Sequence, residues 1–362
     1  MFWSKEYIVE RLSKIPRTLE DISIEVFDGV PPTNDFLQKA GFSRENCTDA
    51  SCVCIDSPTN VEQASTEKGF LYPYVDGSVL NEFAIQSAQY QFMLPYKVLD
   101  NNISKEYRIF QPEELKTKFP AAYKQLMEIR QQSENEKHEL VSADYRFENE
   151  SFLRYINTPK IIVTSNFRLH ASYDPTGKHV FANGVGVVLG DPTLYHYITA
   201  VLNSSIAMAF PEIWSREGVQ HTSNLSSQML KRFPVKFPKK EITETIISTI
   251  ARYLIYLNSQ KQMAKAYAIP GYQKLIDFYK RISDLLILDT YITNDLDPML
   301  LEILSENITA SDGGFEYSDD INLLIGLQEI KKNILSSQDF GKCRFSSEFT
   351  NILATLKNST VW

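Results

Sequence analysis

The chain has 362 residues, a length that predicts two domains, or three at most. Hydrophobic residues make up 43% and aromatic residues 12%, enough to bury substantial cores, and no apolar run reaches the ~20 residues of a membrane span. The formal net charge of −8 taken alone argues against nucleic acid as a partner.

The cysteines favour a reducing environment. Cys47, Cys52 and Cys54 share one short segment, whereas Cys343 is far away, which is not the spacing of a disulfide framework. The first three could supply part of a zinc site, but no second pair of ligands lies nearby, so we predict no metal. Residues 1–15 lack the apolar core of a signal peptide, and we therefore expect a cytoplasmic protein.

The first 150 residues predict short elements of both kinds. Residues 51–66 are polar and rich in turn formers, which predicts a long loop. From their periodicity we predict a helix over residues 7–12, strands over 22–27, 70–75 and 90–96, and a helix that opens at Pro112 and is interrupted by Pro120.

The segment from Pro159 to Ser205 predicts strands followed by a helix. Ile161, Ile162 and Val163 form an apolar strand, and the stretch from Val180 to Val188 is a second, glycine-rich one. Residues 174–177, Asp-Pro-Thr-Gly, predict a turn between them. Asp191 followed by Pro192 predicts a helix start.

After Pro238 the pattern becomes helical. Apolar residues recur at helical spacing from Ile242 to Leu257, and further helices are predicted over 276–287, from Asp297-Pro298, from Asp319 or Asp320, and from Ser346 or Ser347. We therefore predict an α+β protein, with a mixed α/β domain over residues 1–240 and a helical domain over residues 241–362.

Charge is unevenly distributed. Residues 151–240 hold ten Lys or Arg and four Asp or Glu, a balance of +6, so the remainder carries 27 positive and 41 negative residues, a balance of −14. The two add up to the net charge of −8. This asymmetry indicates a basic functional module beside acidic structural parts, although an ordinary solvated face would have the same count.

No catalytic motif is recognisable. A methyltransferase that acts on a base amine carries a Pro-Pro-aromatic loop, whereas Pro31 and Pro32 precede a threonine. The two glycines of "NGVGVV" (Asn183 to Val188) continue a strand instead of opening a helix, so they are not a cofactor loop. Phosphate-binding, nucleophile-elbow and paired-histidine motifs are also absent, so we predict no catalytic residue and no bound cofactor.

Several segments together resemble a known family. The chain is similar to the C-terminal target-recognition domain of TaqI-type adenine-specific DNA methyltransferases, which also occurs in fused restriction-modification enzymes. Seven segments that match its landmarks in order span residues 25–238: "EVFDGVPPTNDFL", "LYPYVDGSVL", "YQFMLPYKV", "EELKTKFPAAYKQLMEIR", "NTPKIIVTSNF", "LYHYITAVLNSSI" and "MLKRFPVKFP". With the looser match "RISDLLILDTYIT", the resemblance covers roughly residues 20–290.

The resemblance implies sequence-specific recognition of double-stranded DNA for a restriction-modification methyltransferase. The methyltransferase domain that normally precedes this region is not in the chain, so we expect either a stand-alone specificity protein or a piece of a longer enzyme. Catalysis and S-adenosylmethionine would belong to that other domain or subunit, which would flip and methylate the adenine. The helices after residue 241 would be either a packing scaffold or a surface that contacts that partner or a second copy of the chain.

The basic module supplies the candidate DNA-binding residues. Asn166, Arg168 and His170 alternate along a predicted strand edge and would read bases, because Arg suits guanine and Asn suits adenine. The other candidates for base or phosphate contacts are Lys160, Lys178, Arg216, Gln220, His221, Asn224, Lys231 and Arg232.

Two alternatives remain open. A specificity subunit of the type I restriction class usually has two recognition domains separated by long helices, whereas only one mixed domain is predicted here. A protein-interaction scaffold that does not touch DNA is favoured by the overall acidity and disfavoured by the central balance of +6.

Overall fold

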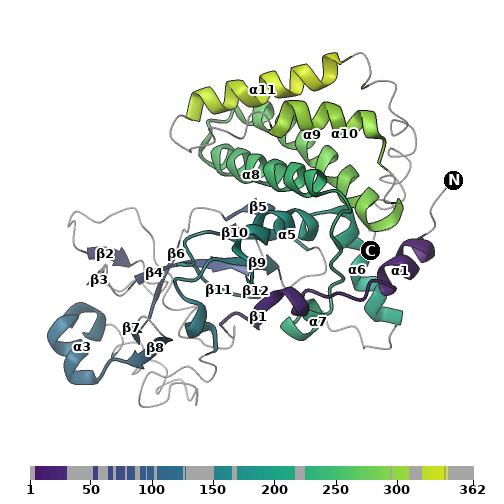
Figure 1. The fold of residues 1–362 in the computed structure, drawn as a ribbon. Coiled ribbons are helices and arrows are strands. Elements are labelled where there is room, and N and C mark those ends of the chain that lie inside the picture. Colours follow the sequence, from purple (N-terminus) through teal and green to yellow (C-terminus); the bar gives the residue numbers. More distant parts are fainter. Residues whose placement is uncertain are drawn as a thin grey trace.

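The computed structural model describes residues 5–30, 52–55, 64–67, 71–77, 80–85, 90–94, 96–101, 104–124, 127, 151–164, 169–216, 225–293, 296–309, 320–337 and 340. Within them a mixed sheet is covered on one side by helices, as Figure 1 shows. The α+β class predicted from the sequence is confirmed.

The strands and helices of the described residues have the following bounds. The strands are β1 (Ser23–Asp28), β2 (Cys52–Ile55), β3 (Ala64–Glu67), β4 (Leu71–Asp76), β5 (Phe83–Ala84), β6 (Tyr90–Met93), β7 (Tyr96–Asn101), β8 (Ser104–Ile109), β9 (Lys160–Thr164), β10 (Ala171–Asp174), β11 (Val180–Ala182) and β12 (Gly184–Leu189). The α-helices are α1 (Lys5–Ser13), α3 (Pro112–Lys118), α5 (Tyr195–Leu202), α6 (Ser205–Arg216), α7 (Ser227–Lys231), α8 (Glu241–Met263), α9 (Ile269–Leu288), α10 (Pro298–Leu304) and α11 (Asp320–Ser336). Short 3-10 and π turns are η1 (Glu20–Ile22), η4 (Ser151–Tyr155), η5 (Pro192–Leu194), η6 (Asp289–Thr293) and η7 (Ser305–Thr309).

The main sheet has the strand order β1-β12-β9-β10-β5. The first four strands pair antiparallel, and β5 joins the edge parallel to β10. β9 is buried on both faces: Ile161 and Val163 belong to the larger buried cluster, and Ile162 belongs to the smaller one on the other side. This is why the sequence of β9 is continuously apolar rather than alternating.

Glycines in β12 make room for aromatic rings. A Cβ on Gly186 would lie 2.5 Å from the Phe27 ring and 2.8 Å from the Phe181 ring, too close for any other residue. Phe27 and Phe181 in turn fill the smaller cluster, with ring centroids 5.7 Å apart. The glycines of "NGVGVV" therefore serve packing within a strand.

The C-terminal helices pack on the sheet through the larger buried cluster, which continues from α5 into α8 and α9. Buried tyrosines tie the layer together: the Tyr253 hydroxyl donates to the Ile308 carbonyl at 3.2 Å and the Tyr279 hydroxyl to the Leu327 carbonyl at 2.7 Å. The division into domains at residue 240 stays a prediction about independent folding.

Local predictions agree with the structure where local signals are strong. Asp191 accepts a hydrogen bond from the Thr193 amide at 2.9 Å, and Asp297 accepts one from the Met299 amide at 3.0 Å, so both cap helices as predicted. The loop predicted over residues 51–66 is wrong in part, because β2 and β3 pair antiparallel within it. The helix predicted from Ser346 or Ser347 lies outside the described residues.

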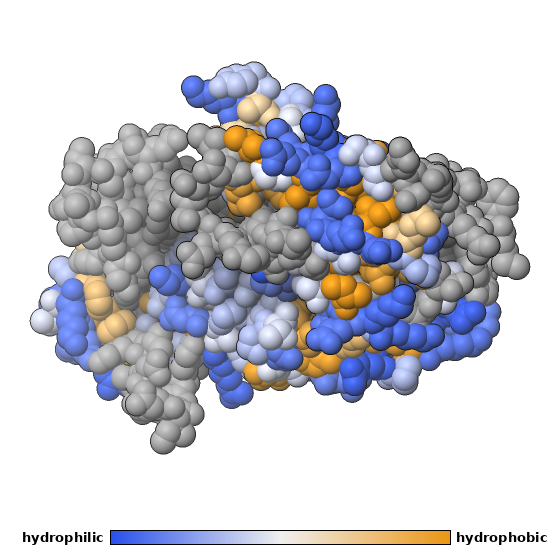
Figure 2. All heavy atoms as spheres, turned by 45° about the horizontal axis from the view of Figure 1, so that its top comes forward, coloured by the Kyte–Doolittle hydropathy of each residue, from blue (hydrophilic) through white to orange (hydrophobic). Residues whose placement is uncertain are grey.

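The outer surface of the helical layer, turned toward the reader in Figure 2, alternates hydrophilic and hydrophobic areas. Its exposed large apolar side chains are spread over several segments and include Met263, Tyr267, Met299, Ile325 and Leu335. None of the helices within the described ranges is both long and apolar enough to span a bilayer. Contact with a methyltransferase partner or a second copy through these helices stays a prediction.

Candidate DNA-binding surface

Lys160 is not on the surface, which corrects its prediction as a DNA contact. Its side chain is 2% exposed and its ammonium lies 3.3 Å from the Asp174 carboxylate, which is fully buried. The Lys160 ammonium also donates to the Gly177 carbonyl at 2.5 Å. A buried ammonium needs such a partner because desolvation of an unpaired charge costs several kcal/mol. Lys160 therefore holds the protein together and cannot reach a phosphate.

Asp174 organises the turn that follows β10. Its carboxylate accepts hydrogen bonds from the Gly177 amide at 3.0 Å, the His179 amide at 3.0 Å and the Thr176 hydroxyl at 2.8 Å. Gly177 has φ +67, and a Cβ there would lie 2.3 Å from Thr158, so only glycine fits. The turn predicted at residues 174–177 is confirmed, and it presents the exposed side chain of Lys178 to solvent.

The charges around Asp174 keep it ionised. Burial by itself raises the pKa of the Asp174 carboxyl, but the neighbouring His179 and the positive charge of Lys160 outweigh burial and hold the pKa well below its ordinary value. The His179 ring nitrogen Nδ1 lies 3.1 Å from the carboxylate, and the His179 side chain is about one-fifth exposed. The negative charge of Asp174 thus neutralises the buried Lys160, and Lys178 is the exposed positive charge of this turn.

Two cations, Arg154 and Lys231, influence the charge state of Tyr155. The Tyr155 ring stacks on Phe27 with centroids 4.8 Å apart. Burial and the negative charge of Glu25 raise the pKa of Tyr155, while the charges of Arg154 and Lys231 lower it. Tyr155 and His179 line one small cavity, so the turn that carries Lys178 is adjacent.

Helix α7 positions the predicted contacts Lys231 and Arg232. Its start is fixed to β1, because the Ser227 amide and hydroxyl donate to the two carboxylate oxygens of Asp28 at 2.8 and 2.7 Å. At its other end the Lys231 ammonium lies 3.3 Å from a Glu25 carboxylate oxygen, and Arg232 is exposed. Lys231 is therefore partly neutralised.

We call Arg154, Lys178, Lys231 and Arg232 the Tyr155 surface. The charges of Arg154 and Lys231 act on the Tyr155 hydroxyl, and Lys231 pairs with the Glu25 carboxylate. Arg232 follows Lys231 and is exposed, and exposed Lys178 precedes His179, which lines a cavity with Tyr155. Lys178, Lys231 and Arg232 were predicted from the sequence, whereas Arg154 was not. No local pattern marks Arg154, because Tyr155 and Lys231 come from distant segments of the sequence.

His170 lies elsewhere and is not part of a strand. β9 ends at Thr164 and β10 begins at Ala171, so the alternation predicted for residues 166–170 does not hold at His170. Its Nδ1 lies 3.3 Å from the Leu80 carbonyl, beside the β5 edge, whereas the Tyr155 surface adjoins β1 at the opposite edge. The structure does not bring His170 together with Lys231 and Arg232.

The remaining candidates stay predictions. Arg216 ends α6. Asn166, Arg168, Gln220, His221 and Asn224 lie outside the described residues.

A further basic group joins the N-terminal segment to the segment after α7. Val235 donates its amide to the Arg17 carbonyl at 2.9 Å, and the Arg17 guanidinium lies 5.5 Å from the Phe237 ring centroid. Partial burial lowers the pKa of Lys236, and the positive charges of Arg11 and Lys239 lower it further, while Asp289 opposes them. The Lys236 ammonium donates to the Tyr291 carbonyl at 3.2 Å. No pattern in the sequence marks this group, because Arg17 and Lys236 are more than 200 residues apart.

Among the described residues no group of three or more His, Cys, Asp or Glu side chains is arranged to hold a metal ion. Tyr74 packs against the smaller buried cluster, and burial raises its pKa to about 12.

Comparisons with known proteins do not assign a family. No family model matches the chain, and no curated protein matches it either. A solved structure of the type IIL restriction-modification enzyme MmeI in complex with DNA is similar to it, with 11% sequence identity and a TM-score of 0.37. That match covers 88% of this chain and 37% of the MmeI chain, so this chain spans little more than a third of that enzyme's length.

Proposed function

We propose that this chain recognises a specific sequence in double-stranded DNA for a restriction-modification adenine methyltransferase. The observation that carries the proposal is the Tyr155 surface. In a chain of net charge −8, Lys178 and Arg232 are exposed on it, and the charges of Arg154 and Lys231 act on the Tyr155 hydroxyl. The seven family-like segments provide independent support, because they lead to the same partner without reference to charge.

Phosphate contacts and base contacts would come from different residues. Lys178 and Arg232 are exposed and sit on short, well-anchored turns, which suits contacts to phosphates that look alike at every step. Asn166, Arg168, His170 and the residues from Gln220 to Asn224 are the candidates for reading base edges, where side-chain hydrogen bonds distinguish one base pair from another. The protein would thus position a target adenine for a methyltransferase domain or subunit, which would supply S-adenosylmethionine and the chemistry.

Fluorescence anisotropy with a labelled mixed-sequence duplex tests the proposal. We expect binding at ~50 mM salt that weakens steeply as salt rises, because each phosphate contact releases condensed counterions. Selection from random duplexes should then enrich one sequence. A chain that binds no duplex at low salt would instead be the protein-interaction scaffold, the second candidate, which the overall charge of −8 favours.

A further inference from the structure

The edge strand β5 has only two residues, so contacts from other segments must stabilise its position. Its two residues pair with Ser172 and Tyr173 of β10. Phe83, the first of them, has φ +68 although it is an aromatic residue that is 1% exposed. A side chain other than glycine adopts this backbone conformation only where surrounding contacts impose it, and such positions gather at functional sites. Contacts on either side of Phe83 must therefore impose its backbone conformation.

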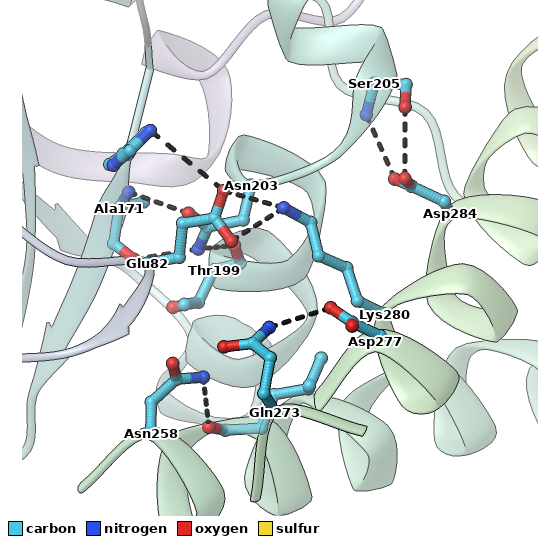
Figure 3. A network of polar contacts seen from close by, with 12 residues as sticks. Glu82, Ala171, Thr199, Asn203, Ser205, Asn258, Gln273, Asp277, Lys280 and Asp284 are labelled. Atoms are coloured by element: carbon cyan, nitrogen blue, oxygen red, sulfur yellow. Dashed lines mark hydrogen bonds and ion pairs between the residues drawn. The ribbon is translucent and has the colours of Figure 1, made fainter. Parts of the chain in front are cut away.

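An ion pair from the helical layer holds the residue before it. The Lys280 ammonium of α9 donates to both carboxylate oxygens of Glu82, each at 2.6 Å, as Figure 3 shows. The two residues are 198 positions apart in the sequence. Their side chains are about one-quarter exposed, so solvent screens this pair less than it screens a fully exposed one.

The same segment fixes His170 and the start of β10. The Ser172 hydroxyl donates to the Asn81 carbonyl at 2.6 Å. The His170 ring lies 3.3 Å from the Leu80 carbonyl through Nδ1 and 4.0 Å from Glu82 through Nε2. Residues 80–84 thus run alongside residues 170–173 and contact them, and the ion pair between Glu82 and Lys280 connects this segment to α9.

α9 braces the neighbouring helices with the same face. Asp284 lies four residues after Lys280, one turn further along the helix. Its carboxylate accepts hydrogen bonds from the Ser205 amide and hydroxyl at the start of α6, both at 3.0 Å, which Figure 3 shows beside the Glu82 pair. Asn203, just before α6, exchanges hydrogen bonds of 2.9 and 2.7 Å with the main chain of Ala171. Lys280 and Asp284 thus bind the segment before β5 and the start of α6, and residues beside these two anchor points bind the start of β10.

We propose that Lys280 is a positioning residue for DNA sequence discrimination, acting through Glu82 on His170 and the start of β10. The inference rests on the proposed function, because it concerns His170, one of the base contacts predicted from the sequence. It gives the C-terminal helices a role beyond packing: they set where the recognition edge of the sheet lies, without touching DNA.

The test compares affinities for the selected duplex and for random duplex. Lys280→Met keeps the aliphatic stem and removes the charge. We expect it to reduce the ratio of specific to random affinity about tenfold, with the slope of log affinity against log salt unchanged, because no phosphate contact is lost. Lys274→Met is the matched control, since Lys274 is an exposed lysine of the same helix, and it should leave the ratio unchanged.

A charge exchange separates positioning from loss of folding. Glu82→Lys combined with Lys280→Glu can restore the pair in the opposite sense, so it should recover most of the discrimination that Lys280→Met loses. Thermal unfolding of each variant shows whether the protein tested is folded.

The outcomes separate the two proposals. If the wild-type chain selects no sequence, the proposed function fails. If the wild-type chain discriminates but folded Lys280→Met keeps the full ratio, the positioning role is refuted while DNA recognition stands. A salt slope shallower by about 0.9 in Lys280→Met also refutes it, because Lys280 would then be a phosphate contact.

Discussion

Replacing Asp174 by asparagine should destabilise the protein strongly. The substitution keeps the size of the side chain and one acceptor oxygen but leaves the Lys160 ammonium, 2% exposed, without its counter-charge. Removing one partner of a buried pair typically costs about 3–5 kcal/mol. The Gly177 carbonyl at 2.5 Å still accepts from Lys160, which places the expected cost near the lower end, about 3 kcal/mol.

Urea denaturation at pH 7 measures this loss. With an m-value of about 3 kcal/mol/M, the midpoint should fall by about 1 M. Asp191→Asn is the matched control: Asp191 is exposed and caps the helical turn at Pro192, and asparagine caps as well as aspartate, so its cost should stay within about 0.5 kcal/mol. An Asp174→Asn cost below about 1 kcal/mol would show that Lys160 does not depend on this partner.

The pH dependence provides a second check. The folded-state pKa of Asp174 is held below its ordinary value, so its contribution to stability is present above about pH 4 and is lost as the pH falls through the folded pKa. The difference between wild type and Asp174→Asn should therefore shrink on acidification below about pH 4. A difference that stays constant there would refute the assigned charge state.

Lys160→Met examines the same pair from the other side. The protein should lose stability, whereas the salt slope of DNA binding by the folded fraction should not change. A slope shallower by about 0.9 would mean that Lys160 reaches a phosphate after all.

Three further predictions address the other groups. Burial raises the pKa of the Asp284 carboxyl, so the charged form of this side chain destabilises the fold. The contribution of Asp284 to stability is therefore present below the ordinary Asp pKa and is lost as the pH rises through the folded pKa. Asp284→Asn should cost less than about 1 kcal/mol in urea denaturation at pH 7, whereas a cost of about 3 kcal/mol would mean that the charge is needed. The double variant Lys231→Ala, Arg232→Ala should weaken binding to all duplexes similarly and make the salt slope shallower by up to about 1.8. In competition titrations, Arg168→Ala should instead cost about 1–3 kcal/mol of binding free energy on the selected site and little on random DNA. Equal losses on both duplexes would show that Arg168 is a phosphate contact. Incubated with labelled S-adenosylmethionine and mixed DNA, the isolated chain should transfer no label, and robust transfer would reveal an active site that the sequence does not announce.

Elements with a local signal could be read from the sequence. The helical stripe from Ile242 to Leu257 predicted α8, and the pairing of Asp297 with Pro298 predicted the start of α10, because caps and apolar periodicity act within one or two turns. The apolar run at residues 161–163 predicted β9 for the same reason. The α+β class follows from summing these local signals.

The positions of charged side chains could not be read in this way. Lys160 and Lys178 are both lysines of one basic segment, yet one is buried against Asp174 and the other is exposed. The burial of Lys160 depends on β9 pairing with β10, which brings residue 174 opposite residue 160. Strand register thus determines whether a lysine is exposed on the surface or buried in an ion pair.

The same reason applies to the groups that carry the proposals. Lys231 acts on Tyr155, Arg17 lies over the Phe237 ring, and Glu82 pairs with Lys280, in each case across a long stretch of sequence. By itself the sequence determined which segments are helices or strands, and that a basic module lies within an acidic chain. Only the tertiary structure decided which charges converge, because Coulomb energy depends on distance in space and the chain's path sets that distance.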